Sequence, residues 1–237
     1  MTNIHYLYDD NIGKVELVQH MGEDITVVNS ARVSFGVQKD NLDIKDQKLI
    51  NYLIKHKHTS TLEHNIATFR IKVPLFVRSQ HHRHRTWSYN EISRRYTDSD
   101  IKFYEPVRFR TQHKSNRQAS NLEDTINPLI NYKTDYSSQL YKKTASDAIC
   151  DHHKISLKLF DDLLTSGICR EQARGILPQN LYTEYYATAN LNNILKFINL
   201  RSHEGAQWEI QRLSDSMLSI VKELWPVTVN SFINNHK

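Results

Sequence analysis

The chain has very few glycines for its length, and their spacing limits how it could bind a phosphorylated ligand. Only six occur among 237 residues. The phosphate-binding loops G-x-G-x-x-G and G-x-x-x-x-G-K need glycines at short fixed spacings, because only glycine lets the backbone approach phosphates closely. No two of the six have either spacing: they are Gly13, Gly22, Gly36, Gly167, Gly175 and Gly205. If the chain binds a dinucleotide or a triphosphate, it does not use these loops.

Hydrophobic periodicity predicts a helix-rich mixture of helices and strands. Residues 67–73 alternate apolar and polar side chains, which is typical of a half-buried strand. Residues 206–224 repeat apolar side chains every three or four positions, which predicts an amphipathic helix that Pro226 closes. Regular β-α-β alternation is absent, so the pattern indicates a mixed α+β chain. The other expected elements are helices at 44–56, 74–83, 132–166 with Gly167 as its cap, and 190–200, an element of either type at 181–189, and a mobile polar loop at 109–121.

Positive charge is concentrated between residues 70 and 95. These 26 residues hold seven Lys or Arg side chains and one acid, Glu91, for a net charge of +6, whereas the whole chain carries +5. Such a local excess attracts an anionic partner, which could be nucleic acid, a phosphorylated small molecule or acidic lipid. Arginine offers a rigid fork of donors that suits phosphate.

The charged segment and the nearby histidines have three other interpretations. A run of charge is usually a solvated face. A metal site at His56, His58 and His64, or at residues 81–84, is disfavoured because adjacent arginines repel a cation, and we expect no metal. A nucleic-acid surface would interleave aromatic platforms with the cations, and few are present. No RRM, KH or zinc-finger pattern occurs, so we expect no nucleic-acid partner.

The sequence also bears on cellular compartment. No run of about 18 apolar residues is present, and the first ten residues lack an apolar signal core, so we expect no membrane partner. Cys150 and Cys169 have neither metal-ligand nor C-x-x-C spacing. We expect both cysteines to be structural and buried, and the protein to be cytoplasmic.

Several motifs stand in a fixed order. Arg83-His84-Arg85, seven residues and then Ser93 form the pattern R-H-R-x7-S. The flanking matches are Ala31 to Ser34, His58 and His64 as H-x5-H, Ser88, Asn90, Glu91, Arg95 and Tyr96, Arg174 with Leu177-Pro178, Asn190, and Arg201 with residues 206–210. Over about residues 14–225 the chain resembles the flavin-dependent thymidylate synthases.

The resemblance implies an activity and an assembly. In that family a one-carbon unit passes from 5,10-methylenetetrahydrofolate to C5 of dUMP and is reduced to methyl by the flavin of FAD, which NADPH recharges. We therefore expect dUMP, folate and NADPH as partners. We also expect a helix-rich α+β fold with a small antiparallel sheet, one domain over residues 1–237, and a homotetramer whose active sites are shared between subunits. Side chains from several subunits would then replace the missing glycine loops.

The resemblance also assigns residues to ligands. The residues implied for dUMP are Gln80, His81, His82, Arg83, Glu91, Ile92, Ser93, Arg94, Arg95, Arg174 and Arg201. Those implied for FAD are Ser60, Arg83, His84, Arg85, Glu91, Asn190, Asn192 and Lys196. Arg201 would be the catalytic residue, because a permanent cation against the uracil ring stabilises the N3-deprotonated form and makes C5 nucleophilic.

Two features qualify the match. The family often has Arg at Asn192, Asn or His at Lys196, and His at Gly205, so the contacts of these positions with flavin can differ here. Neither cysteine lies in a basic or motif-like setting, and Ser93 has no evident His–acid relay. We therefore expect chemistry without a covalent bond between enzyme and dUMP.

Overall fold

The computed structural model describes residues 4–106, 108–117, 119–132 and 141–236. The chain forms two compact units. The first comprises Met1–Val73, Ser79–Glu91 and Glu184–Lys237, and the second comprises Pro74–Arg78 and Ile92–Thr183. The expected mixed α+β class is confirmed, with 45% helix.

The first unit is built on a five-stranded sheet with the order β1-β2-β3-β9-β4. Its strands pair antiparallel, as expected. The predicted strand at 67–73 is confirmed as part of β3, where alternate side chains from Ala67 to Val73 are fully buried. The strands are β1 (Ile4–Tyr6), β2 (Lys14–Met21), β3 (Ile66–Pro74), β4 (Ser88–Glu91) and β9 (Tyr182–Asn190), whose first two residues belong to the second unit. The undecided element at 181–189 is therefore a strand.

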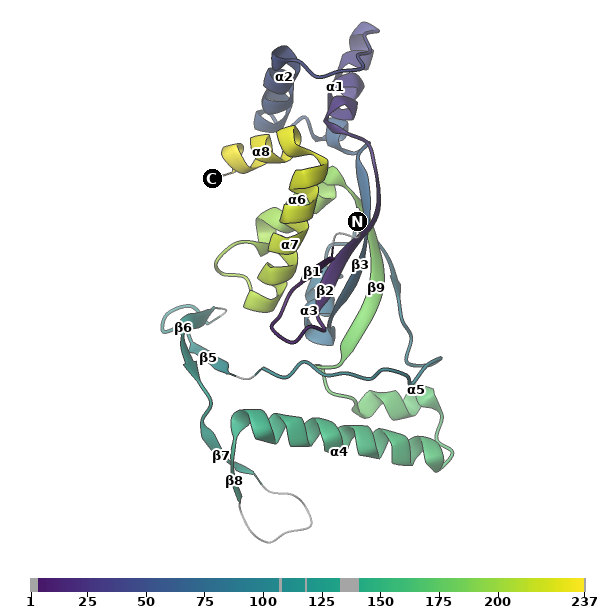
Figure 1. The fold of residues 1–237 in the computed structure, drawn as a ribbon, viewed down its shortest axis with the longest axis vertical. Helices are drawn as coiled ribbons and strands as arrows, with labels where there is room; N and C mark the ends of the chain where they lie inside the picture. Colours follow the sequence, from purple (N-terminus) through teal and green to yellow (C-terminus); the bar gives the residue numbers. More distant parts are fainter. Residues whose placement is uncertain (1–3, 107, 118, 133–140, 237) are drawn as a thin grey trace. The chain divides into compact units, whose positions relative to one another are not determined.

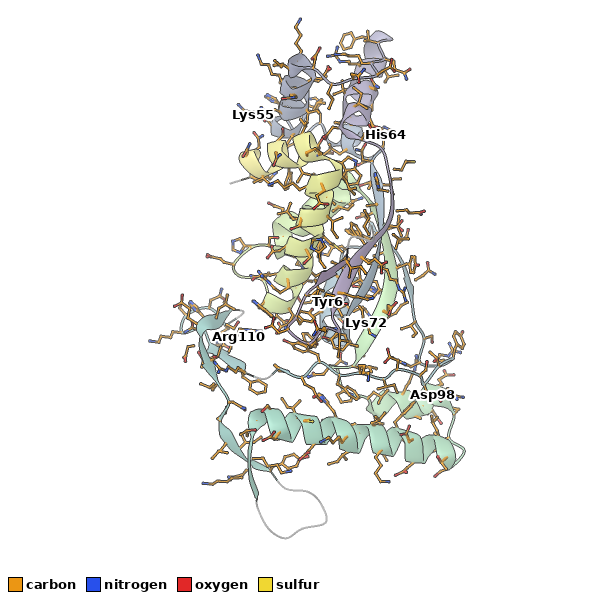
Figure 2. The ribbon with its side chains drawn as sticks, viewed as in Figure 1. Tyr6, Lys55, His64, Lys72, Asp98 and Arg110 are labelled. Atoms are coloured by element: carbon orange, nitrogen blue, oxygen red, sulfur yellow. The ribbon has the colours of Figure 1, made fainter. Side chains whose placement is uncertain are left out.

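Helices pack beside this sheet in the first unit (Figure 1). The predicted helices at 44–56, 190–200 and 206–224 are confirmed as α2 (Ile44–Lys55), α6 (Leu191–Arg201) and α7 (Trp208–Leu224). α7 lies against β2 and α6, where its apolar side chains, such as Leu213 and Met217, are fully buried. Pro226 ends that pattern as expected, but it also begins α8 (Pro226–Asn235), which packs on α2. α1 (Asp24–Arg32) precedes α2 in the chain. Figure 2 labels Lys55 at the end of α2 and Tyr6 on β1.

A buried carboxylate fixes the start of α8 against the start of α1. Asp24 accepts hydrogen bonds from the main-chain N–H groups of Val227 and Thr228, each at 2.9 Å, and from the Thr228 hydroxyl at 2.5 Å. The first N–H groups of a helix have no partner inside the helix, so this carboxylate supplies one. The nearby Trp225 is fully buried, and its indole N–H donates to Gly22 O at 2.9 Å.

The second unit has its own apolar core. Phe160 and Ala173 are fully buried, and Leu177 and Leu181 nearly so. They come from α4 (Ala145–Thr165), α5 (Arg170–Ala173) and the segment that leads into β9. Gly167 ends the long helix at φ +88°, and its N–H donates to Leu164 O at 3.0 Å, which confirms the predicted cap.

Two helix predictions were wrong in their bounds. α4 begins at Ala145, where the Thr144 side chain accepts from Asp147 N, rather than at 132, and residues 133–140 lie outside the described residues. The flanking residues instead form β7 (Leu129–Tyr132) and β8 (Tyr141–Thr144). The helix predicted at 74–83 is shorter: α3 covers Leu75–His81, and Pro74 ends β3.

The expected loop at 109–121 is largely a hairpin. β5 (Phe109–Gln112), which includes Arg110 labelled in Figure 2, pairs antiparallel with β6 (Ser120–Ile126). The turn is held by its own polar groups, because the Gln112 side chain donates to Asn116 O and Ala119 O at 3.2 and 3.0 Å. The polar composition led to the prediction of a loop, whereas the two strands are held together by main-chain hydrogen bonds and by the turn contacts. Residue 118 lies outside the described residues.

No helix among the described residues is long and apolar enough to cross a membrane.

Candidate active site

Arg201 ends α6, and its guanidinium is held by two acceptors, one near the end of α3 and one in the turn that follows it. Its Nε donates to His84 Nε2 at 3.3 Å, and one of its terminal nitrogens donates to Gln80 O at 3.4 Å. The side chain is partly buried, and burial lowers the pKa of Arg201 from its usual value. An arginine nevertheless stays protonated at working pH. The structure therefore fixes a cation with its other donor atoms left for a ligand.

His84 presents a neutral ring to Arg201. Burial, and secondly the positive charge of Arg201, lower the pKa of His84 to about 4. A histidine that accepts at Nε2 carries its proton on Nδ1. Phe197, on the same helix as Arg201, packs edge-on against the imidazole at 4.9 Å between ring centroids. The orientation of the Arg201 cation thus depends on an uncharged His84.

The side chain of Gln80 joins a second element to this group. Its Nε2 donates to Gln207 Oε1 at 2.5 Å, and Gln207 Nε2 donates to Glu209 Oε2 at 2.9 Å. Gln207 precedes α7, whereas Gln80 is on α3, so the contact joins positions 127 residues apart. The predicted nucleotide residues Gln80 and Arg201 are therefore brought together in the first unit.

His81 lies in an aromatic cluster beneath the same segment. The ring is fully buried, and its Nδ1 lies 2.9 Å from the Tyr185 hydroxyl. Phe197 and Trp87 pack against it at 4.7 and 4.8 Å between centroids. Burial, followed by the charges of nearby groups including Arg201, lowers the pKa of His81 well below its ordinary value. The His81 side chain is thus in the protein interior, while the predicted neighbour His82 is half-buried.

Three of the predicted anion-binding arginines are exposed. Arg83 and Arg85 follow α3 in the first unit, and Arg174 follows α5 in the second. Within the part of the chain that the structure describes, none of these three guanidinium groups forms an ion pair. Arginines without an acidic partner can give all their donors to a phosphate.

The remaining predicted dUMP residues adopt defined local structure in the second unit. Ser93 Oγ accepts from Arg95 N at 3.3 Å. Arg94 donates to Ser99 O at 2.6 Å, and burial lowers the pKa of its guanidinium. Arg95 lies 3.8 Å from the Glu171 carboxylate. Ile92 is exposed, and Glu91 ends β4 in the first unit, so the predicted residues are divided between the two units.

Four of the predicted flavin residues, Ser60, Asn190, Asn192 and Lys196, lie on α6, at its N-cap or on η2 (Thr59–Leu62), which contacts α6, whereas His84 contacts Arg201 at the end of α6. Asn190 is the N-cap of α6, with its side chain accepting from Asn193 N at 3.0 Å. Asn192 is buried and donates to Glu63 Oε1 at 3.0 Å, whereas Lys196 and Ser60 are exposed. Asn192 and Lys196 line a mostly apolar cavity of about 170 Å³, together with Leu53, Ile54, Lys57, His58, Thr59, Leu62, Leu195, Phe232 and His236.

The expectation that both cysteines are buried was wrong, because neither of them is buried. Cys169 is exposed at the N-cap of α5, and Cys150 is half-buried on α4. The Cys169 thiol lies 3.7 Å from Gln172 Oε1. In the described ranges, no group of three or more His, Cys, Asp or Glu side chains is placed to hold a metal ion.

A family model described as "Thymidylate synthase complementing protein" matches residues 16–227. A "Flavin-dependent thymidylate synthase" of Thermosipho africanus is 37% identical over 221 residues, which are 93% of this chain and 91% of the relative. The chain belongs to the flavin-dependent thymidylate synthase family. Another such synthase, from Thermus thermophilus, is 40% identical over 93% of this chain and 75% of its own length.

Solved structures agree with this assignment. The structure of "a UMP/dUMP methylase PolB from Streptomyces cacaoi bound with 5-Br dUMP" has a TM-score of 0.73 and 29% identity, covering 93% of this chain and 94% of that chain. The family resemblance predicted from the motifs is therefore confirmed. The protein is a flavin-dependent thymidylate synthase (EC 2.1.1.148) and uses a flavin.

The sequence patterns gave no indication of the residues that pack around His81 and His84. Tyr89, Tyr185 and Phe197 form the cluster beneath His81 and His84. In β9, Tyr185, Ala187 and Ala189 occupy every second position, and this period of two could have placed Tyr185 on the buried face of a strand. The contact between Gln80 and Gln207 gives no sequence signal, because it joins two segments far apart in the chain.

Proposed function

We propose that the chain reductively methylates dUMP to dTMP with 5,10-methylenetetrahydrofolate as one-carbon donor and NADPH as reductant, through FAD. The contact that carries this proposal is the one between Arg201 and the neutral His84. This contact supports the proposal because it holds a cation at the position where the family motif predicts contact with the pyrimidine. The related methylase bound with 5-Br dUMP supports a pyrimidine nucleotide as substrate.

Arg201 acts by charge rather than by proton transfer. Two hydrogen bonds orient its guanidinium, so little reorganisation is needed when negative charge develops on uracil. That charge raises the electron density at C5, which then attacks the methylene carbon. The neutral His84 accepts a hydrogen bond from the cation without competing for the same anion.

The exposed arginines bind the phosphate groups. Arg83, Arg95 and Arg174 are assigned to the dUMP phosphate. The other residues assigned to dUMP, through side-chain or main-chain groups, are Gln80, His81, His82, Glu91, Ile92, Ser93 and Arg94. For Arg83 and Arg174, the supporting observation is that neither guanidinium is paired with an acid among the residues described. Because His81 is fully buried, its contribution would come from its main chain.

The chemistry of the residues assigned to the cofactor fits an FAD. Arg85 and Lys196 are exposed cations that suit the pyrophosphate, and Ser60, Arg83, His84, Glu91, Asn190 and Asn192 complete the assigned set. The apolar cavity beside Asn192 and Lys196 supplies a surface for a flat ring. When bound, the flavin supplies the hydride that converts the one-carbon unit to methyl.

The enzyme itself supplies no covalent nucleophile in this proposal. Cys150 is half-buried inside a helix, and Cys169 is an exposed cap residue whose thiol lies 3.7 Å from the Gln172 amide oxygen. We further propose a single functional domain over residues 1–237, a cytoplasmic location, and a homotetramer with active sites shared between subunits.

Absorbance spectroscopy tests the proposal. Purified protein reconstituted with FAD should show a flavin absorbance maximum at about 450 nm, and NADPH should decrease this absorbance because the flavin carries the redox chemistry. It should form dTMP only when dUMP, NADPH and methylenetetrahydrofolate are all present. Protein that binds no FAD, or that forms dTMP without NADPH, would contradict the proposal.

A further inference from the structure

Tyr89 ties together the two ends of the turn that carries His84. The turn follows α3, and His84 N donates to His81 O at 3.0 Å. The Tyr89 hydroxyl lies 3.0 Å from His81 O and 3.0 Å from His84 O. The last carbonyl groups of a helix lack partners within the helix, so a side-chain donor at this place fixes how the chain leaves it.

Tyr89 itself is held in place. It lies on β4, where its main chain pairs with Ala187 of β9. Its ring packs on His82 at 4.1 Å and edge-on against His81 at 5.3 Å between centroids. Burial raises the pKa of Tyr89 well above its ordinary value, so the hydroxyl remains a donor at working pH.

Both acceptors of Arg201 are tied to the turn that Tyr89 fixes, because His84 lies in the turn and Gln80 O accepts from Arg83 N of the turn at 3.3 Å. One is His84 Nε2, and the other is the carbonyl oxygen of Gln80, the residue before His81. A shift of this turn would move both acceptors at once. Small displacements of an orienting group are costly in catalysis, because the site must be organised before charge develops.

We propose that Tyr89 is a positioning residue, which orients the Arg201 cation toward the pyrimidine by fixing the turn from His81 to His84. The inference rests on the proposed role of Arg201. It predicts that loss of the Tyr89 hydroxyl lowers kcat more than it raises KM for dUMP, because Arg94, Arg95 and Arg174 of the assigned dUMP set lie outside this turn.

Tyr89→Phe tests this inference, because it removes the hydroxyl and keeps the ring. The matched control is Tyr8→Phe, since the Tyr8 hydroxyl also donates to a buried main-chain oxygen, Glu209 O, at 3.2 Å. We expect kcat to fall about tenfold in Tyr89→Phe with KM for dUMP within about twofold, and the control to keep wild-type kcat.

The pKa of His84, measured by NMR of histidine-labelled protein, provides a readout that does not need turnover. The titratable groups around His84 are Arg201, His81 with its ring 6.3 Å away, and Tyr89. A released turn exposes His84 to water, so in Tyr89→Phe its pKa should rise from about 4 toward 6.5. His84→Gln assigns the resonance.

The outcomes separate the two proposals. If wild-type protein makes no dTMP, the proposed function fails, while the His84 titration still tests the positioning role. Wild-type kcat in Tyr89→Phe, an unchanged His84 pKa, or an equal loss of kcat in Tyr8→Phe would each overturn the inference.

Discussion

The Nε atom of Arg201 donates to Nε2 of His84 across 3.3 Å, although the two residues are 117 positions apart. The bond requires an unprotonated His84, and burial with the nearby cation lowers the pKa of that histidine to about 4. A positive charge is thereby oriented by a neutral ring. This arrangement suits an enzyme that stabilises negative charge on a bound nucleotide.

Arg201→Ala should lower dTMP formation about 10³-fold, because it removes the cation that stabilises charge on uracil. FAD binding, which depends on other residues, should remain. Steady-state assays and flavin absorbance measure the two effects. Arg212→Ala is the control, since this arginine is paired with Asp215 at 2.7 Å and should keep its activity. Wild-type turnover in Arg201→Ala would remove its assigned role.

The folded protein should lose stability as pH falls from about 6.5 toward 4. Over this range the unfolded chain protonates His84, whereas the folded pKa of about 4 keeps it neutral. The unfolded state then binds more protons, so the free energy of unfolding decreases on acidification. His84 is partly exposed, and solvent screening reduces its contribution to about 1 kcal/mol.

Urea unfolding at pH 7 and pH 5 measures this effect. The lowered pKa of His81 acts in the same direction, so His84→Gln should reduce the pH dependence without abolishing it. An identical pH dependence in wild type and His84→Gln would show that His84 titrates normally in the folded chain.

Asp24→Ala should destabilise the first unit by about 3 kcal/mol, because two main-chain donors and the Thr228 hydroxyl lose a charged acceptor in a buried site. The control is Asp215→Ala, in which an exposed carboxylate is removed at a cost of less than about 1 kcal/mol. Equal midpoints in urea for both variants would contradict this account of the start of α8.

Cys150→Ala combined with Cys169→Ala should retain dTMP formation within about twofold, because no thiolate attacks dUMP in this account. Circular dichroism checks that the double variant is folded. A folded double variant without activity would revive a covalent mechanism.

The sequence predicted the elements whose signal is local. The buried alternation in β3 and the three-to-four spacing of α7 follow from side chains within one element. Predictions failed where the determining contact is polar or main-chain. The hairpin of β5 and β6 has few apolar residues, and the start of α4 is set by the Thr144 cap rather than by periodicity.

The site could be predicted only in part. The motif resemblance assigns Arg201 and Gln80 to dUMP and His84 to FAD, and the structure joins these three residues. It could not show that His81 is buried, that Cys169 is exposed, or that Gln207 meets Gln80, because these facts depend on how distant segments pack.

A crystal structure with FAD and dUMP tests the central claim most directly. The account predicts the Arg201 guanidinium within hydrogen-bonding distance of the uracil ring, still held by His84, with Arg83 and Arg174 on the dUMP phosphate. Arg201 turned away from the pyrimidine, with Arg83 and Arg174 touching neither ligand, would contradict it.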